Sequence, residues 1–228
     1  MHEALYERID RLKVPVADLA DGCRQRGLQV RVADATLRPA VALSRLAGTA
    51  VTLRLYLAEG PVDYNEAMAR VYELGRTRFR AVLVARNEVP RFTSMGSGGS
   101  RVARAHGYVG CVVGGPIRDT QELPEIDFPV FGTAICPDSV PVDRMPGGKS
   151  IHFELGTPVD IAGITIRPGD AVVGDNDGLI AVDPGDLEAV LDEAEKIVRV
   201  EALIFRLLAE GKTFREVLDL LARGAGGA

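Results

Sequence analysis

Two short stretches of the sequence carry residue types that could bind and activate a small acid. The first is Gly96, Ser97, Gly98 and Gly99, which stand just before a predicted helix. Three glycines within four residues leave the backbone free to point N–H groups at an anion beside the positive end of that helix. A flexible Gly/Ser connector would have the same composition. A Walker loop is excluded because no Gly-Lys-Ser/Thr follows.

The second stretch, about twenty residues later, ends an apolar run with Arg118 and Asp119, and Glu122 follows three residues on. Most Arg-Asp pairs lie solvated in turns, where they contribute on the order of 0–1 kcal/mol. If both stretches follow neighbouring strands, however, they meet at the carboxyl edge of one sheet and face one crevice. There a guanidinium would bind a 2-oxo acid, a carboxylate would hold Mg²⁺ or Mn²⁺, and Glu122 would orient the waters of the metal.

Composition excludes several other classes of protein. The 228 residues are 46% hydrophobic, enough to fill a core, and no window approaches an uninterrupted membrane span. A net charge of −5 disfavours nucleic acid as a partner, and the five arginines between Arg76 and Arg91 are explained by the ends of a helix and a strand. The three cysteines are too few for a disulfide framework, and buried free thiols are expected. With a charged amino terminus, the chain is predicted to be cytoplasmic.

The elements that must position these residues follow from hydrophobic periodicity and turn chemistry. Helices are predicted over residues 3–12, 16–26, 64–74, 101–106 and 184–221, and strands over 46–58 and the apolar runs around 81, 110 and 130. This βαβ alternation gives way to short antiparallel strands between 157 and 184. Asp175, Asp177 and Asp183 lack the twelve-residue calcium-loop pattern and are interpreted as turn formers. We expect one domain over residues 1–228.

Gly96-Ser97-Gly98-Gly99, the gap of about twenty residues, Arg118-Asp119 and Glu122 resemble the motif of class II 4-hydroxy-4-methyl-2-oxoglutarate aldolases. These share a family with the regulators of ribonuclease E activity, the RraA-like proteins. The likeness covers nearly the whole chain. It implies an α/β fold, an α/β/β/α sandwich with a swivelling β/β/α-type core, assembled as a homotrimer or hexamer with sites between subunits.

The same resemblance implies roles for individual residues. The glycine loop would bind the pyruvyl carboxylate, Arg118 would contact substrate, and Asp119 would ligate Mg²⁺ or Mn²⁺. Glu122 would act through a metal-bound water, and Glu201, on the last helical segment, would do so in the neighbouring subunit. Glu201 could equally be a solvated helix charge. Cleavage would release pyruvate through its enolate, so decarboxylation of oxaloacetate should accompany it.

A competing interpretation is a non-catalytic protein that binds and inhibits a ribonuclease. Asp119 favours the enzyme, because it supplies the metal-binding acid after the arginine. A methyltransferase is disfavoured, since the sequence has no strand-linked glycine motif for an adenosyl cofactor. The acceptor fragment of the substrate is not indicated by any residue of the sequence.

Overall fold

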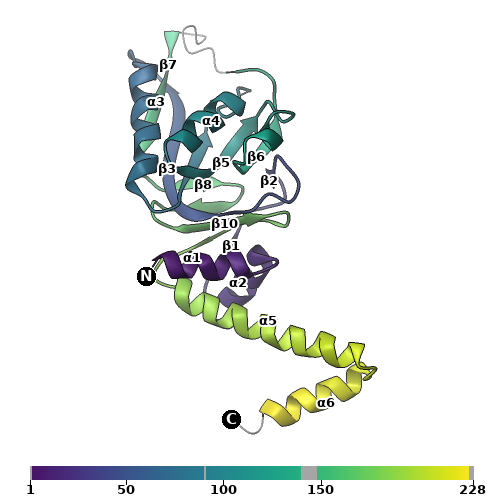
Figure 1. Ribbon diagram of the computed structural model, residues 1–228. Helices are drawn as coiled ribbons and strands as arrows, with labels where there is room; N and C mark the ends of the chain where they lie inside the picture. Colours follow the sequence, from purple (N-terminus) through teal and green to yellow (C-terminus); the bar gives the residue numbers. More distant parts are fainter. Residues whose placement is uncertain (1, 90, 140–147, 226–228) are drawn as a thin grey trace.

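The computed structural model describes residues 2–89, 91–139 and 148–225, and shows a mixed α/β protein (Figure 1). The helices are α1 (His2–Arg11), α2 (Pro15–Gln25), α3 (Tyr64–Glu73), α4 (Ser97–Ala105), α5 (Leu187–Ala209) and α6 (Phe214–Ala225), with 3₁₀ turns at Leu74–Thr77 and Leu123–Glu125. The strands are β1 (Arg31–Val32), β2 (Arg38–Pro39), β3 (Leu46–Ala58), β4 (Ala81–Asn87), β5 (Tyr108–Ile117), β6 (Val130–Ile135), β7 (Ser150–Leu155), β8 (Val159–Ile161), β9 (Ile164–Ile166), β10 (Ala171–Asp175) and β11 (Gly178–Val182).

Nine strands form one sheet in the order β1-β11-β10-β3-β4-β5-β6-β2, and β7 pairs with the second half of β3. Strands β3 to β6 are parallel, while β1, β2, β7, β10 and β11 pair antiparallel with their neighbours. Strands β8 and β9 form a separate hairpin. The parallel centre therefore places the ends of β4 and β5 side by side.

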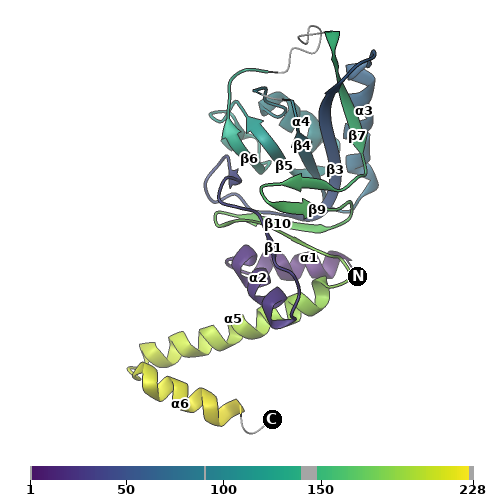
Figure 2. The same ribbon diagram turned by 180° about the vertical axis from the view of Figure 1, so that it is seen from behind.

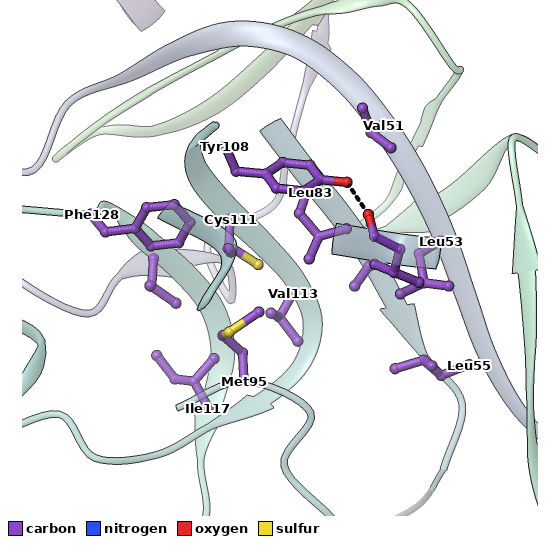
Figure 3. Packing of buried hydrophobic residues seen from close by; sticks show 14 of the residues in the cluster. Val51, Leu53, Leu55, Leu83, Met95, Tyr108, Cys111, Val113, Ile117 and Phe128 are labelled. Atoms are coloured by element: carbon purple, nitrogen blue, oxygen red, sulfur yellow. Dashed lines mark hydrogen bonds between the residues drawn. The ribbon is translucent and has the colours of Figure 1, made fainter. Parts of the chain in front are cut away.

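Alternating side chains of the sheet fill two different cores. On β3 to β5 the odd positions, such as Leu53, Leu83 and Val113, pack beneath α3 and α4, and Figure 3 shows this cluster, which includes Met95. The even positions, such as Val84, pack on the opposite face against Ile161 and the rest of the β8–β9 hairpin. This period of two is what a strand covered on both faces requires.

A third core joins α1, α2 and the start of α5 to strands β10 and β11. Ile180 of β11 and Leu191 of α5 are fully buried within it. The layers are thus α3 and α4, the large sheet, the β8–β9 hairpin, and a helical layer under β10 (Figures 1 and 2). The predicted α/β/β/α arrangement and fold class are confirmed.

The carboxyl-terminal helices extend away from this body as an arm formed by the second half of α5 and by α6 (Figures 1 and 2). Several large apolar side chains of the arm are exposed: Val200, Phe205, Leu208, Phe214, Leu218 and Leu220. None of the helices described is both long and apolar enough to cross a bilayer.

Most predicted elements are observed, with two corrections. Helix α4 begins at Ser97 and not at the predicted residue 101, so Gly98 and Gly99 lie inside its first turn. Cys23 and Cys111 are buried free thiols as expected, but Cys136 is half-exposed. The aspartates assigned to turns do form them, since Asp175 accepts a hydrogen bond from the Asp177 N–H at 2.8 Å.

Candidate functional site

The ends of β4 and β5 bring the two predicted stretches together. The loop that follows β4 runs back along the end of β5, where Met95 bridges to Ile117 and the Arg118 N–H donates to the Met95 carbonyl at 3.1 Å. The buried Thr93 hydroxyl fixes the loop further, because it donates to the Pro116 carbonyl at 2.9 Å. These contacts place the start of α4 against residues 118 and 119, as the sequence predicted.

Asp119 lies at the amino-terminal end of α4. Its Oδ2 accepts hydrogen bonds from the Ser97 N–H at 2.9 Å and from the Ser97 hydroxyl at 3.2 Å. The backbone of Asp119 has a φ of +56°, a left-handed conformation that aspartate tolerates better than most residues and that clusters at functional sites. The carboxylate therefore caps a helix whose own N-cap residue, Gly96, has no side chain to do so.

This arrangement is possible because the side chains of Arg118 and Asp119 come very close to the backbone of Gly96. A Cβ at Gly96 would stand 2.3 Å from Asp119 Oδ2 and 2.9 Å from Arg118 Cγ. Gly96 has φ −147° and ψ −167°, an extended backbone open to any residue. Glycine is required there for space and not for conformation.

Positive groups surround the same point. The Arg118 Nε lies 3.4 Å from Asp119 Oδ2, and both side chains are about one third exposed. The first N–H groups of a helix have no intrahelical acceptor, so those of Gly98 and Gly99 are available to a ligand beside Arg118. The site can thus hold an anion next to a carboxylate.

A cavity of about 250 Å³ opens over these residues, near the lower limit of about 300 Å³ for small-molecule sites. One side is formed by Gly96, Gly98, Gly99, Arg118 and Asp119, and the other side by helix α3. Tyr64, Met68 and Tyr72 recur every four residues on α3 and so present one helical face to the cavity. Thr93, Ser94, Met95 and Ser139 complete the described lining.

Tyr72 faces the glycine turn, since a Cβ at Gly99 would lie 3.5 Å from its Oη. Burial raises the pKa of Tyr72 to about 12, with smaller contributions from Tyr64 and Cys111. The phenol is therefore protonated at neutral pH and can donate a hydrogen bond into the cavity.

The residues present fit a hard divalent cation held mainly by water. Of the residues that the structure describes, no group of three His, Cys, Asp or Glu is placed to hold a metal. Mg²⁺ nevertheless often uses one or two carboxylates and keeps several waters. Asp119 Oδ2 is engaged by Ser97 and Arg118, whereas Oδ1 has no hydrogen bond to the described part of the chain. This oxygen could serve as the single protein ligand.

The two other predicted carboxylates are placed differently. Glu122 is exposed in the turn after Asp119, whose carbonyl accepts its N–H at 2.9 Å, and it does not line the cavity. Glu201 is exposed on α5, a helix that extends away from the part of the molecule that holds α4 (Figure 1). Within the protomer, the charge of Glu201 contributes, after burial, to the raised pKa of Asp18. A role for Glu201 in a neighbouring subunit stays a prediction.

Sequence reasoning missed the wall contributed by α3 and also Ser94. The Ser94 Oγ is buried and has no hydrogen-bond partner among the described residues. The spacing of four residues between Tyr64, Met68 and Tyr72 was visible, but nothing in the sequence indicated which surface that face covers.

Comparison with known proteins shows the family of the chain. The family model described as RraA-like, aldolase/RraA, matches residues 16–181. A Deinococcus radiodurans protein provisionally named a 4-hydroxy-4-methyl-2-oxoglutarate aldolase is 30% identical over 74% of this chain and 94% of its own length. A Burkholderia mallei protein with the same provisional name is 30% identical over 70% and 88%.

Solved structures show the same fold. An uncharacterised Pseudomonas syringae protein matches with a TM-score of 0.73 and 22% identity over 94% of this chain and 96% of that one. A Streptomyces coelicolor protein, described as an unusual member of the RNase ES inhibitor RraA protein family, matches with a TM-score of 0.72 and 23% identity over 88% and 94%. On the strength of the family model and the relatives at 30% identity, this chain belongs to the RraA-like family.

Proposed function

We propose that this protein is a divalent-metal-dependent lyase, a class II pyruvate aldolase that cleaves 4-hydroxy-2-oxo acids and also decarboxylates oxaloacetate. The observation that carries the proposal is the position of Asp119. Its carboxylate is held by Ser97 and Arg118 on the side of a small cavity that also carries the N–H groups of Gly98 and Gly99. The names of the relatives support the same class of reaction.

The residues of the site would have two roles, substrate binding and stabilisation of the negative charge that develops in the reaction. The N–H groups of Gly98 and Gly99 would bind the substrate carboxylate, and the Arg118 guanidinium would face the C2 oxygen, where negative charge develops as the C3–C4 bond breaks. The protonated Tyr72 would donate to one of these oxygens. A cation held by Asp119 would supply Lewis acidity and would lower the pKa of bound water, which is the chemistry expected of Mg²⁺ or Mn²⁺.

Glu122 and Glu201 would each contact the cation through a bound water, and Glu201 would do so from a neighbouring subunit. The exposed apolar arm supports association with further copies of the chain, and we propose three or six chains by analogy with the aldolases that the sequence resembles. We place the enzyme in the cytoplasm.

The proposal is tested by pyruvate release from a panel of 4-hydroxy-2-oxo acids and oxaloacetate, with and without Mg²⁺. Asp119→Asn keeps the size and the turn conformation but removes the charge, so the fold should persist while metal affinity falls. Activity should drop by about two to four orders of magnitude, because a charge-stabilising metal contributes several kcal/mol. Full activity of Asp119→Asn would refute the proposed role.

The competing function, a protein that masks a ribonuclease, is favoured by the same exposed arm, which could contact another protein. It makes a different prediction. The protein would then be inert on every 2-oxo acid and indifferent to chelators, yet would lower ribonuclease activity in a purified assay.

A further inference from the structure

The cavity runs along one face of α3, and a tyrosine of that helix stands near each of its ends. Tyr72, near the end of α3, lies beside the glycine turn, because a Cβ at Gly99 would stand 3.5 Å from its Oη. Tyr64, the first residue of α3, borders the same cavity two helical turns earlier. The Tyr72 end is the one assigned above to the pyruvyl carboxylate. The Tyr64 end is therefore left for the other half of the substrate.

The spacing of the two tyrosines suits a substrate with a carboxylate at each end. Eight residues of α-helix, from Tyr64 to Tyr72, advance about 12 Å along the helix axis. An extended five-carbon diacid measures about 7 Å between its outermost oxygens. With one hydrogen bond of about 2.8 Å at each end, such a molecule spans about the same distance. Its middle carbons would then pass Met68, which lines the cavity between the two tyrosines.

The Tyr64 ring is held in place by packing. It is half-buried and stands edge-on to the ring of Phe153 on β7, with the ring centroids 5.4 Å apart. Figure 1 shows α3 and β7 side by side at this edge of the molecule. Burial raises the pKa of Tyr64, so its hydroxyl keeps its proton at neutral pH and can donate a hydrogen bond. A donor already ordered by packing loses little conformational entropy when a ligand binds.

A carboxylate gains more from such a donor than an alkyl group does. Hydrogen bonds to a charged acceptor are roughly twice as strong as those between neutral groups. An alkyl group against the Tyr64 hydroxyl would remove water from it without replacing the lost hydrogen bond, which is unfavourable. Two of the proposed substrates, 4-hydroxy-2-oxoglutarate and oxaloacetate, carry a second carboxylate beyond the pyruvyl group.

Resting on the proposed aldolase function, we propose that Tyr64 determines specificity for the leaving half of the substrate, because its hydroxyl donates a hydrogen bond to the carboxylate on C4. During cleavage the C4 hydroxyl passes its proton to water, and C4 becomes the carbonyl carbon of the departing 2-oxo acid. The C3–C4 electron pair remains on the pyruvate enolate, which then takes a proton at C3. Tyr64 takes no part in these bond changes and acts by binding and orienting the tail.

The first test is Tyr64→Phe, which removes the hydroxyl and keeps the ring packed on Phe153. With the full-length protein and Mg²⁺, kcat/KM is measured for 4-hydroxy-2-oxoglutarate and for 4-hydroxy-2-oxopentanoate, in which a methyl group replaces the tail carboxylate. The parent should favour the diacid, and Tyr64→Phe should reduce that preference by about tenfold or more, because a hydrogen bond to a charged group is lost. Equal rates in the parent, or an unchanged ratio in a folded Tyr64→Phe protein, would overturn the inference.

Two further tyrosines provide matched controls for the same chemical change. Tyr72→Phe should lower kcat/KM for both substrates by a similar factor, because both carry the pyruvyl group. Tyr56→Phe, on β3 and outside the described lining of the cavity, should leave both rates and their ratio unchanged. A Tyr72→Phe protein whose ratio changed as much as that of Tyr64→Phe would contradict the assignment of the two tyrosines to different ends.

Oxaloacetate gives a readout that a merely structural role of Tyr64 would not produce. Its second carboxylate leaves as CO₂ and loses its charge, so a hydrogen bond to that group stabilises the bound substrate more than the transition state. Tyr64→Phe should therefore raise KM for oxaloacetate without lowering kcat. A fall in kcat for oxaloacetate as large as the fall in diacid cleavage would indicate general damage to the site and would contradict the inference.

A last measurement separates this inference from the proposed function. Exchange of the pyruvate methyl protons for deuterium requires the enolate but no tail, so Tyr64→Phe should exchange at the rate of the parent. Exchange and cleavage in the parent without a preference for the diacid would overturn the role of Tyr64 and leave the aldolase standing. Absence of both exchange and cleavage would overturn the aldolase and, with it, this inference.

Discussion

Gly96→Ala tests the site with the smallest possible change. The new Cβ would stand 2.3 Å from Asp119 Oδ2, about 1.1 Å inside the 3.4 Å at which ordinary contact begins. The extended backbone of Gly96 accepts alanine, so the whole effect is steric. The Asp119 carboxylate must move away by about an ångström, and its 2.9 Å hydrogen bond from the Ser97 N–H must then break.

The size of the effect follows from that displacement. A hydrogen bond to a charged group contributes about 1.5–3 kcal/mol, and for a chain of this size a loss of that order lowers Tm by roughly 5 °C. Misplacing a catalytic group by about 1 Å can cost about 100-fold in rate. We therefore expect Gly96→Ala to remain folded, to bind Mn²⁺ more weakly, and to lose about 100-fold in kcat/KM.

The assay combines Mn²⁺ titration followed by electron paramagnetic resonance, thermal unfolding and pyruvate release. Gly98→Ala is the matched control for metal binding, because its Cβ would meet nothing within 4 Å and would leave Asp119 in place. Alanine also suits the first turn of α4 better than glycine, so Tm should not fall. Wild-type Mn²⁺ affinity and turnover in Gly96→Ala would refute the geometry described for Asp119.

Three further predictions concern other parts of the molecule. Arg118→Lys should lose most activity although the charge is kept, because one ammonium cannot replace a planar guanidinium, and steady-state kinetics near the parent would remove Arg118 from the mechanism. The exposed Phe205 and Phe214 of the arm favour association, and the resemblance to the aldolases implies trimers, so light scattering at micromolar concentration should give a mass that is a multiple of three chains of 24.4 kDa; a monomer would contradict this. Asp18 is buried, and burial, followed by the charge of Glu201, raises its pKa from 3.8 to about 6, so the folded state holds a proton that the unfolded state releases. The free energy of unfolding should therefore fall as pH rises from about 4 to about 6. Asp18→Asn should be more stable than the parent by about 3 kcal/mol at pH 8 but not at pH 4. Denaturant titrations that show no pH-dependent difference between the two proteins would contradict this prediction.

The meeting of the glycine turn with Arg118 and Asp119 was predictable because it depends on local signals. Each stretch follows an apolar run, the two runs are joined by a helix, and parallel neighbours bring their carboxyl ends to one edge. The contact between Ser97 and Asp119 confirms that reasoning. It required no knowledge of how distant elements pack.

The remaining parts of the site depend on tertiary packing and were not predictable. Tyr72 reaches the cavity because α3 packs against β7, and β7 itself pairs with the second half of β3, a strand about 100 residues earlier in the sequence. Gly98 and Gly99 were expected to precede α4, because each glycine in a helix is less favourable than alanine by about 1 kcal/mol. Asp119 overrides that preference by capping the turn from another loop. The predicted role of Glu201 would depend on a second chain, about which one sequence carries no signal.

The capping of α4 by a residue from another loop has a consequence for local stability. Ser97, Gly98 and Gly99 are poor helix formers, so the first turn of α4 is held closed largely by Asp119. We therefore expect the turn and the carboxylate to open together, before the core does. Amide hydrogens of this turn should exchange faster when the Asp119 contact is weakened, while those of β4 and β5 keep their protection. Hydrogen exchange would thus report the state of the Asp119 carboxylate without substrate or turnover.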